Sequence, residues 1–369
     1  MLIGVPKEIK AQENRVGMNP DSVKEVVQAG HKVIVETKAG QGILASDDDY
    51  RAAGAEILGT AKDIFDKSDM IVKVKEPQAI ECEMLREGQI LFTYLHLAAD
   101  VKQAQGLMNS GCVAIAYETV TGARGGLPLL APMSEVAGRM APQMAAFYAQ
   151  KHMGGMGRLM SGVPGVEPAD VVVIGGGVSG FNSARVAVGM GARVTILERS
   201  PERIRFLDEY FATSANVVMS NAASIERYAL NSDIVIGAVL IPGAAAPLLI
   251  RKEHLSQMRP SSVIVDIAID QGGCLETSKA TTHNDPIYEV EGIVHYCVAN
   301  MPGAYPQSST AALNHATLPY TLEIANKGWK QALIDNPYLR EGLNVLNGQI
   351  TYKAVADALQ LDYQQAFAA

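Results

Sequence analysis

At 369 residues the chain is too long for one typical hydrophobic core, and its length predicts about two domains. Hydrophobic residues make up 48% of the chain and charged residues 19%, which is typical of a packed globular enzyme and argues against disorder. The net charge of −8 comes from interspersed acids and bases without a basic stripe, which argues against a nucleic-acid partner. The four cysteines and seven histidines stand at no metal-ligand spacing, so we expect no metal.

The most apolar stretch, residues 236–250, is too short for a membrane span. It falls below the ~20 residues that cross a bilayer, and Pro242, Gly243 and Pro247 interrupt it. The N-terminal residues follow a strand pattern and lack the basic and apolar regions of a secretory signal. We therefore expect a cytoplasmic protein with no membrane partner.

The first 130 residues alternate short apolar runs with helical patterns. Helices are predicted at 21–29 and 99–109, among others. The predicted strands are residues 2–5, 32–36, 70–73, 89–94 and 113–117. This βαβ rhythm predicts a parallel sheet that is covered on both faces.

A long helical pattern at 133–152, with Ser134 as its predicted cap, leads out of this first domain. Six strands that suit a doubly wound sheet follow at 171–174, 193–197, 217–219, 233–238, 262–267 and 293–297. After Asn300 come helical patterns at 310–330 and 352–359. Because the second sheet is complete before this tail, we expect the tail to fold back on the first domain; a separate C-terminal cap is the alternative.

The most informative motif is the run VVVIGGGVSG at 171–180. A buried strand, a G-x-G-x-x-G turn (Gly175, Gly177, Gly180), a helix, and a second strand that ends at Glu198 follow one another at the spacing of a dinucleotide-binding unit. The three glycines permit the tight turn, the approach of a pyrophosphate and close helix packing, respectively. The helix N-terminus favours the phosphates, and Glu198 can accept hydrogen bonds from the ribose hydroxyls. A plain glycine-rich turn is the alternative.

Three polar residues follow strands in the first half of the chain. Arg15 lies in a loop after the first strand, while Lys75 and His96 close later strands, where ligands of α/β domains bind. Arginine and lysine suit a carboxylate or carbonyl oxygen, and histidine transfers protons near neutral pH. Taken singly, Lys75 can also be a solvated charge, His96 a core histidine and Arg15 half of a surface pair.

In the second half, the segment SVIVDIAIDQGGCLE carries two acids after an apolar strand. Asp266 needs hydrogen-bond partners if it is buried. Asp270 precedes a glycine turn that lifts it off the sheet, so it is a candidate proton acceptor; a turn-capping aspartate is the alternative.

At this point the chain resembles the family of bacterial L-alanine dehydrogenases over nearly its whole length. The resemblance is carried by MLIGVPKEIKAQENRV, IVKVKEP, QILFTYLHLAA, LPLLAPMSEVAGR, GVPGVEPADVVVIGGG and DIAIDQGGC. It implies that Arg15 and Lys75 bind the substrate and that His96 and Asp270 are the acid/base groups. It also implies NAD as cofactor, L-alanine, pyruvate and ammonium as small-molecule substrates, and a homohexamer.

The residues that the resemblance assigns to NAD lie mostly in the middle of the chain. They are Met133, Ser134, Gly175, Gly177, Val178, Ser179, Gly180, Glu198, Arg203, Ser220, Val239, Leu240, Ile267, Ala268, Ile269, Asp270, Val298, Ala299, Asn300 and Met301. NAD is favoured over NADP because the carboxylate of Glu198 would repel a 2′-phosphate, although Arg199 beside it would attract one.

Together these observations predict an α/β protein of two doubly wound, Rossmann-like domains with parallel sheets and an interdomain cleft. The expected substrate domain is 1–132 plus 307–369, and the expected NAD domain is 133–306. Two other functions stay open: a transhydrogenase-like module that passes hydride to a second nucleotide, and a non-catalytic NAD-binding scaffold.

Overall fold

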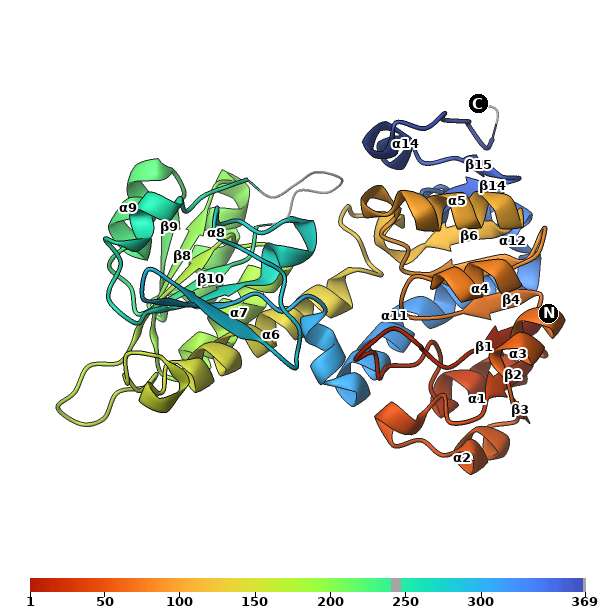
Figure 1. The fold of residues 1–369 in the computed structure, drawn as a ribbon, viewed down its shortest axis with the longest axis horizontal. Coiled ribbons are helices and arrows are strands. Elements are labelled where there is room, and N and C mark those ends of the chain that lie inside the picture. The colour runs from red at the N-terminus through yellow and green to blue at the C-terminus, as the bar shows by residue number, and fades with distance from the viewer. Residues whose placement is uncertain (240–246, 368–369) are drawn as a thin grey trace. The chain divides into compact units, whose positions relative to one another are not determined.

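The computed structural model describes residues 1–239 and 247–367 (Figure 1). The chain divides into two compact units, one formed by Met1–Met133 with Tyr305–Ala369 and the other by Ser134–Ala304. Each unit is built on one sheet whose strands lie between helices, which is the α/β class that the alternating pattern predicts.

The described part of the first unit contains an eight-stranded sheet with the order β15-β14-β6-β5-β4-β1-β2-β3. Its strands are β1 (Leu2–Val5), β2 (Lys32–Glu36), β3 (Glu56–Leu58), β4 (Met70–Val72), β5 (Ile90–Thr93), β6 (Val113–Ala116), β14 (Leu343–Leu346) and β15 (Gln349–Ile350). The strands from β6 to β3 are parallel, and several of them are buried along their whole length because helices cover both faces.

The helices of this unit begin and end at recognisable capping residues. Helix α1 (Pro20–Gln28) begins one residue before the predicted start at 21, and its cap is Asn19, whose side chain accepts from the backbone of Ser22. Asp100 caps α5 (Val101–Ser110), which ends at Gly111 with φ of 68°. The other helices are α2 (Asp47–Ala52), α3 (Ala61–Lys67), α4 (Ala79–Met84), α11 (Pro306–Lys327), α12 (Trp329–Asp335), α13 (Pro337–Arg340) and α14 (Lys353–Leu359).

The C-terminal tail contributes both helices and strands to the first unit. Strand β14 pairs antiparallel with β6, and β15 continues as a hairpin. The side chain of Asn314 in α11 donates to the carbonyl of Gly17 and accepts from the backbone of Asn19. Because β14 and β15 are antiparallel, the sheet of the first unit is mixed rather than wholly parallel as predicted. A strand from the end of the chain can pair in either direction at an open edge of a sheet.

The second unit has a seven-stranded sheet, again counted over the described residues, with the order β12-β13-β11-β10-β7-β8-β9. Its strands are β7 (Asp170–Ile174), β8 (Arg193–Glu198), β9 (Ala215–Met219), β10 (Ile234–Gly237), β11 (Val263–Asp266), β12 (Ile287–Val290) and β13 (Ile293–Tyr296). Its helices are α6 (Ala131–Tyr148), α7 (Val178–Gly189), α8 (Pro201–Phe211), α9 (Ala222–Ala229) and α10 (Lys252–Leu255).

Six parallel strands of this sheet form the doubly wound order predicted for a dinucleotide-binding domain. Alternate residues of β7 enter two separate cores, with Val171 and Val173 in one and Val172 and Ile174 in the other. Strand β12, which the sequence reading missed, pairs antiparallel with β13 at the edge. The predicted cap Ser134 is wrong, because α6 begins at Ala131 and Ser134 lies inside its first turn.

Candidate active site and nucleotide site

Three of the predicted site residues follow neighbouring strands of the first sheet. Arg15 lies in the loop after β1, Lys75 follows β4 and His96 follows β5, and these strands are adjacent in the order β5-β4-β1. The carboxyl ends of parallel strands meet at one edge of the sheet, so the fold brings two cations and an imidazole to that edge.

Arg15 is buried and its guanidinium is held by Glu13. The Nε and Nη2 atoms of Arg15 lie 2.7 Å and 2.5 Å from the two carboxylate oxygens of Glu13, and Nη1 lies 3.0 Å from the sulfur of Met133. Burial acts to lower the pKa of Arg15, but Glu13 outweighs it and the pKa rises. Arg15 is thus a buried, fixed cation rather than half of a surface pair.

Lys75 is only 8% exposed, so it is not a solvated strand-end charge. Its carbonyl accepts from the hydroxyl of Thr93 at 3.0 Å, which extends the contact between the ends of β4 and β5. Burial acts to raise the pKa of the neighbouring Glu76, but the charges of Lys75 and Lys10, with a smaller contribution from His96, hold that pKa below its ordinary value. Lys75 and His96 therefore act on the same small region.

His96 is exposed, which excludes a core histidine. Its backbone is left-handed, with φ of 51°, and its ring is stacked on that of Tyr94 with 5.8 Å between centroids. The carboxylate of Glu118 accepts from the backbone N–H groups of Leu95 and His96, the latter at 2.6 Å. This bond holds the turn that presents the imidazole, and nothing in the sequence spacing indicated Glu118 or Glu13.

The glycine turn of the second unit has the geometry that its motif predicts. Gly175 has φ of 98°, and a Cβ on Gly180 would lie 1.7 Å from the carbonyl oxygen of Gly175. A Cβ on Gly177 would meet nothing within 4 Å, so this residue faces open space at the start of α7. A close-packed helix whose N-terminus opens to space suits a pyrophosphate.

Glu198 lies at the end of β8 beside this turn. Its carboxylate accepts from three backbone N–H groups, those of Gly176 at 2.7 Å, Arg199 at 2.7 Å and Ser200 at 2.9 Å. The Nε of Arg203 donates to the carbonyl of Gly176 at 2.7 Å. The acid is therefore fixed where the ribose of a dinucleotide is expected.

Other predicted cofactor residues lie at the ends of the strands of the same sheet. Ser220 follows β9 and donates its N–H to the carbonyl of Glu198, Val239 follows β10, and the 298–301 segment follows β13. Asn300 has φ of 66°, and its carbonyl lies 3.1 Å from the Nε2 of His283. Leu240 lies outside the described residues.

Asp270 lies in a 3₁₀ turn (Ile267–Gln271) after β11, and it is exposed. The turn is organised by Asp266, which is buried. Its carboxylate accepts from the backbone N–H groups of Ala268 and Cys274 at 3.0 Å and 2.9 Å, and from the hydroxyl of Ser278 at 2.5 Å. Asp266 thus has the hydrogen-bond partners that a buried acid needs, and these bonds hold the turn on which Asp270 is exposed.

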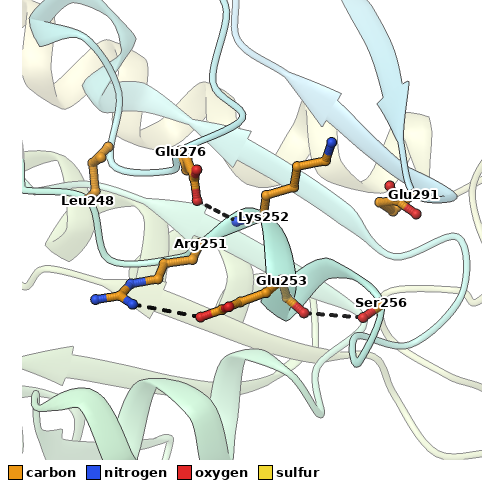
Figure 2. Close-up of a pocket in the computed structure, with 7 residues that line it drawn as sticks. All are labelled: Leu248, Arg251, Lys252, Glu253, Ser256, Glu276 and Glu291. Atoms are coloured by element: carbon orange, nitrogen blue, oxygen red, sulfur yellow. Dashed lines mark hydrogen bonds and ion pairs between the residues drawn. The ribbon is translucent and has the colours of Figure 1, made fainter.

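One concavity of the described surface lies away from these residues. It is lined by Leu248, Arg251, Lys252, Glu253, Ser256, Glu276 and Glu291 (Figure 2). Arg251 and Glu253 form an ion pair in it, the carboxylate of Glu276 accepts from the backbone N–H of Lys252, and it contains no predicted site residue. We assign it no function.

Residues 1–239 and 247–367 contain no cluster of His, Cys, Asp and Glu that could hold a metal ion. None of the helices in this part of the chain combines the length and hydropathy needed to span a membrane.

A Rossmann-type nucleotide unit, together with cations and an imidazole at a sheet edge, defines the class of a nucleotide-dependent oxidoreductase. Comparison with known proteins names the family. The chain belongs to the alanine dehydrogenase/PNT family, because the model of the family's N-terminal domain matches residues 4–137 and that of its C-terminal domain matches residues 141–353.

The similar proteins match nearly the whole length of this chain. An alanine dehydrogenase of Methanococcus maripaludis is 55% identical over 99% of this chain and 98% of its own length, and one of Halomonas elongata is 54% identical over 99% of both. A solved L-alanine dehydrogenase has a TM-score of 0.94 and 48% identity over 98% of this chain and 99% of its own. A transhydrogenase of Sinorhizobium meliloti has a TM-score of 0.81 and 26% identity over 96% of this chain and 100% of its own.

Proposed function

We propose that the chain catalyses the NAD-dependent oxidative deamination of L-alanine to pyruvate, ammonium and NADH, and the reverse reductive amination. The chain is an oxidoreductase that acts on alanine with a nicotinamide nucleotide as cofactor, as its similarity to alanine dehydrogenases supports. The observation that carries the proposal is the placement of Arg15, Lys75 and His96 at adjacent strand ends, where the cations suit a small carboxylate and the imidazole suits proton transfer.

We assign the substrate to the first unit and the nucleotide to the second. Arg15 and Lys75 would bind the carboxylate and carbonyl oxygens, which fixes the substrate's orientation. NAD is preferred over NADP because the carboxylate of Glu198, held by three backbone N–H groups, would repel a 2′-phosphate. By the family resemblance, we further propose that the enzyme is a cytoplasmic homohexamer.

The proposed reaction needs several proton transfers. The nicotinamide, when bound, accepts the hydride that leaves Cα of alanine. Before that step a base must take a proton from the substrate's ammonium group, because the positive nitrogen opposes hydride loss. Water then adds to the resulting imine and ammonia leaves, which requires a base and an acid in turn. We assign these transfers to His96 and Asp270, whose side chains are both exposed in the structure.

The proposal is tested with the purified chain, NAD and a panel of amino acids, by following NADH absorbance. Alanine-selective NADH formation is the expected result, with NADP giving a much smaller rate. A chain that binds NADH tightly but shows no signal with any amino acid would contradict the proposal and favour a binding scaffold. Hydride transfer to a second nucleotide, without any amino acid, would favour the transhydrogenase-like alternative, to which the 26% identical structure points.

Variants of the acid/base pair test the assignment of roles. His96→Ala and Asp270→Asn should each lower turnover by about a hundredfold or more while NADH binding stays nearly unchanged. Arg15→Ala should mainly raise the KM for alanine and pyruvate. Turnover like that of the wild type in either acid/base variant would refute the assignment of that residue.

A further inference from the structure

On the side that faces β1, the end of β4 is held by a side chain beyond the point where the backbone pairing stops, whereas on the other side backbone bonds to the β5 segment continue as far as Val74. The parallel pairing of β1 with β4 covers Ile3↔Met70 and Gly4↔Ile71 and goes no further. Beyond it, Val74 donates its backbone N–H to Oε1 of Glu8 at 2.6 Å. A carboxylate oxygen thus takes the place that a carbonyl of β1 would occupy. Together with the bond from the N–H of Tyr94 to the carbonyl of Val74 at 3.2 Å, it fixes the chain just before Lys75.

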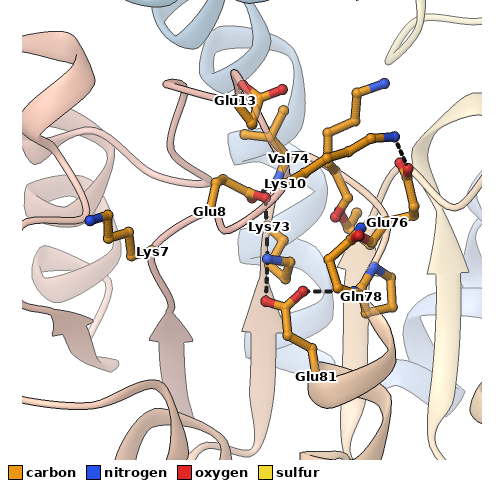
Figure 3. Close-up of polar contacts among 12 residues, drawn as sticks. Lys7, Glu8, Lys10, Glu13, Lys73, Val74, Glu76, Gln78 and Glu81 are labelled. Atoms are coloured by element: carbon orange, nitrogen blue, oxygen red, sulfur yellow. Dashed lines mark hydrogen bonds and ion pairs between the residues drawn. The ribbon is translucent and has the colours of Figure 1, made fainter.

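The other oxygen of Glu8 belongs to a buried ionic cluster (Figure 3). The Nζ of Lys73 lies 3.2 Å from Oε2 of Glu8 and 2.6 Å from Oε1 of Glu81, and Oε2 of Glu81 accepts from the backbone N–H of Gln78 at 2.8 Å. Glu8, Lys73 and Glu81 are 6%, 0% and 1% exposed. The cluster therefore joins the loop after β1, the end of β4 and the first turn of α4.

A second link joins the same two segments on the other side of Lys75. Lys10, in the loop between β1 and α1, forms an ion pair with Glu76, as Figure 3 shows. The residues on either side of Lys75, Val74 and Glu76, are thus both attached to the loop that carries Arg15.

The loop is also fixed beyond Arg15. Gly17 lies directly against the end of β4, where a Cβ would come within 2.2 Å of the carbonyl oxygen of Val72. The loop is thus attached to the end of β4 both before and after Arg15, and the end of β4 is attached to the loop both before and after Lys75. These contacts restrict the backbones that carry the two cations from moving apart.

Burial makes this arrangement sensitive to the charge on Glu8. Burial acts to raise the pKa of Glu8, and Lys73 opposes it without cancelling it. Lys73 faces two carboxylates, which together outweigh the effect of its burial and raise its pKa. Lys73 therefore stays an ammonium, and it holds Glu8 in the position where it meets Val74.

We propose that Glu8, supported by Lys73 and Glu81, is a positioning residue that sets the distance between Arg15 and Lys75 and thereby the affinity for the small carboxylic acid. This inference rests on the proposed function, because it assumes that the two cations bind the substrate. Glu8 acts through the backbone and through Lys73, and it takes no part in proton transfer.

The test compares Glu8→Ala with Glu8→Gln and with a matched control at the opposite end of the same strand pair. There, Asp69 accepts the backbone N–H of Leu2 at 2.7 Å, which is the same kind of bond between the same two strands, far along them from Lys75. The KM for alanine and pyruvate, kcat, the Kd for NADH and the melting temperature are measured for each intact variant.

Glu8→Ala should raise the KM for both substrates by roughly tenfold, because it removes a bond to a charged acceptor, while the Kd for NADH changes by less than about twofold. Glu8→Gln keeps an oxygen for Val74 and should raise the KM by only about threefold. Asp69→Ala should leave the KM within about twofold of wild type even if its melting temperature falls, because the bond that it removes is far from Lys75.

An unchanged KM in both Glu8 variants would overturn the inference, as would an equal rise in Asp69→Ala. If Glu8→Ala does not fold, an unchanged KM in Glu8→Gln alone overturns the inference.

The experiment distinguishes a failure of this inference from a failure of the proposed function. A wild-type chain that oxidises alanine, with Glu8 variants of unchanged KM, defeats only the inference, whereas a wild-type chain with no alanine-dependent signal defeats the proposed function and the substrate role of Glu8 with it.

Discussion

Removing the carboxylate of Asp266 should open the turn that carries Asp270. In the structure this buried carboxylate accepts from the N–H groups of Ala268 and Cys274 and from the hydroxyl of Ser278. In Asp266→Ala the two backbone N–H groups lose their hydrogen-bond acceptor, and each buried donor left without one costs about 1–3 kcal/mol. The hydroxyl of Ser278, in contrast, can rotate to another acceptor. The expected loss is about 2–6 kcal/mol, a large part of the roughly 5–15 kcal/mol that stabilises a domain.

The loss is best measured as local opening, by hydrogen exchange at the amides of Ala268 and Cys274, because a two-unit chain need not unfold in one step. Ser278→Ala is the matched control. Ser278→Ala removes one donor and leaves no other donor without an acceptor, so it should lower the free energy of local opening by less than about 1.5 kcal/mol. Asp266→Ala should also lower kcat, because Asp270 loses its support. Exchange at both amides within about 0.5 kcal/mol of wild type would refute this reasoning.

Three further outcomes follow from the same geometry. Glu118→Ala should lower kcat about tenfold with an unchanged Kd for NADH, since the His96 turn loses its acceptor; normal kinetics would count against that role. Burial raises the pKa of Cys82 to about 12 and of Cys297 to about 11, so both buried thiols should resist a disulfide reagent at neutral pH until the chain unfolds, and rapid labelling of the folded chain would contradict this. Burial also raises the folded-state pKa of Asp266, so this group stabilises the fold at low pH and loses that contribution as pH rises through the folded-state pKa. The free energy of local opening measured by hydrogen exchange at the amides of Ala268 and Cys274, taken for wild type relative to Asp266→Asn, should therefore increase as pH falls toward 3.8, and a flat difference would exclude a raised pKa.

Local patterns in the sequence were sufficient for the parallel core of each sheet. The strands β1 and β2 begin and end at the predicted residues, and β7 and β8 differ by one residue at one end, because apolar runs bounded by polar and glycine residues are signals within a few positions. The glycine turn was equally readable, since the conformation of Gly175 and the packing of Gly180 depend on near neighbours.

The edges of the sheets differ in how far local patterns specify them. Strand β12 (IYEV) is joined to β13 by the two residues Glu291 and Gly292, so this hairpin has a local signal that the predicted strands did not include. The antiparallel pairing of β14 with β6, in contrast, joins segments more than 200 residues apart. No local pattern specifies which open edge such a strand joins.

The sequence by itself determined the nucleotide motif and put Arg15, Lys75, His96 and Asp270 after strands, because residue type and strand ends are local properties. Only the tertiary structure decided how these side chains are held. Glu8 reaches Val74 and Glu118 reaches His96 across 66 and 22 positions of the chain. An acid in a sequence does not state its partner, since the partner is chosen by which strands become neighbours and which groups are left without water when they pack.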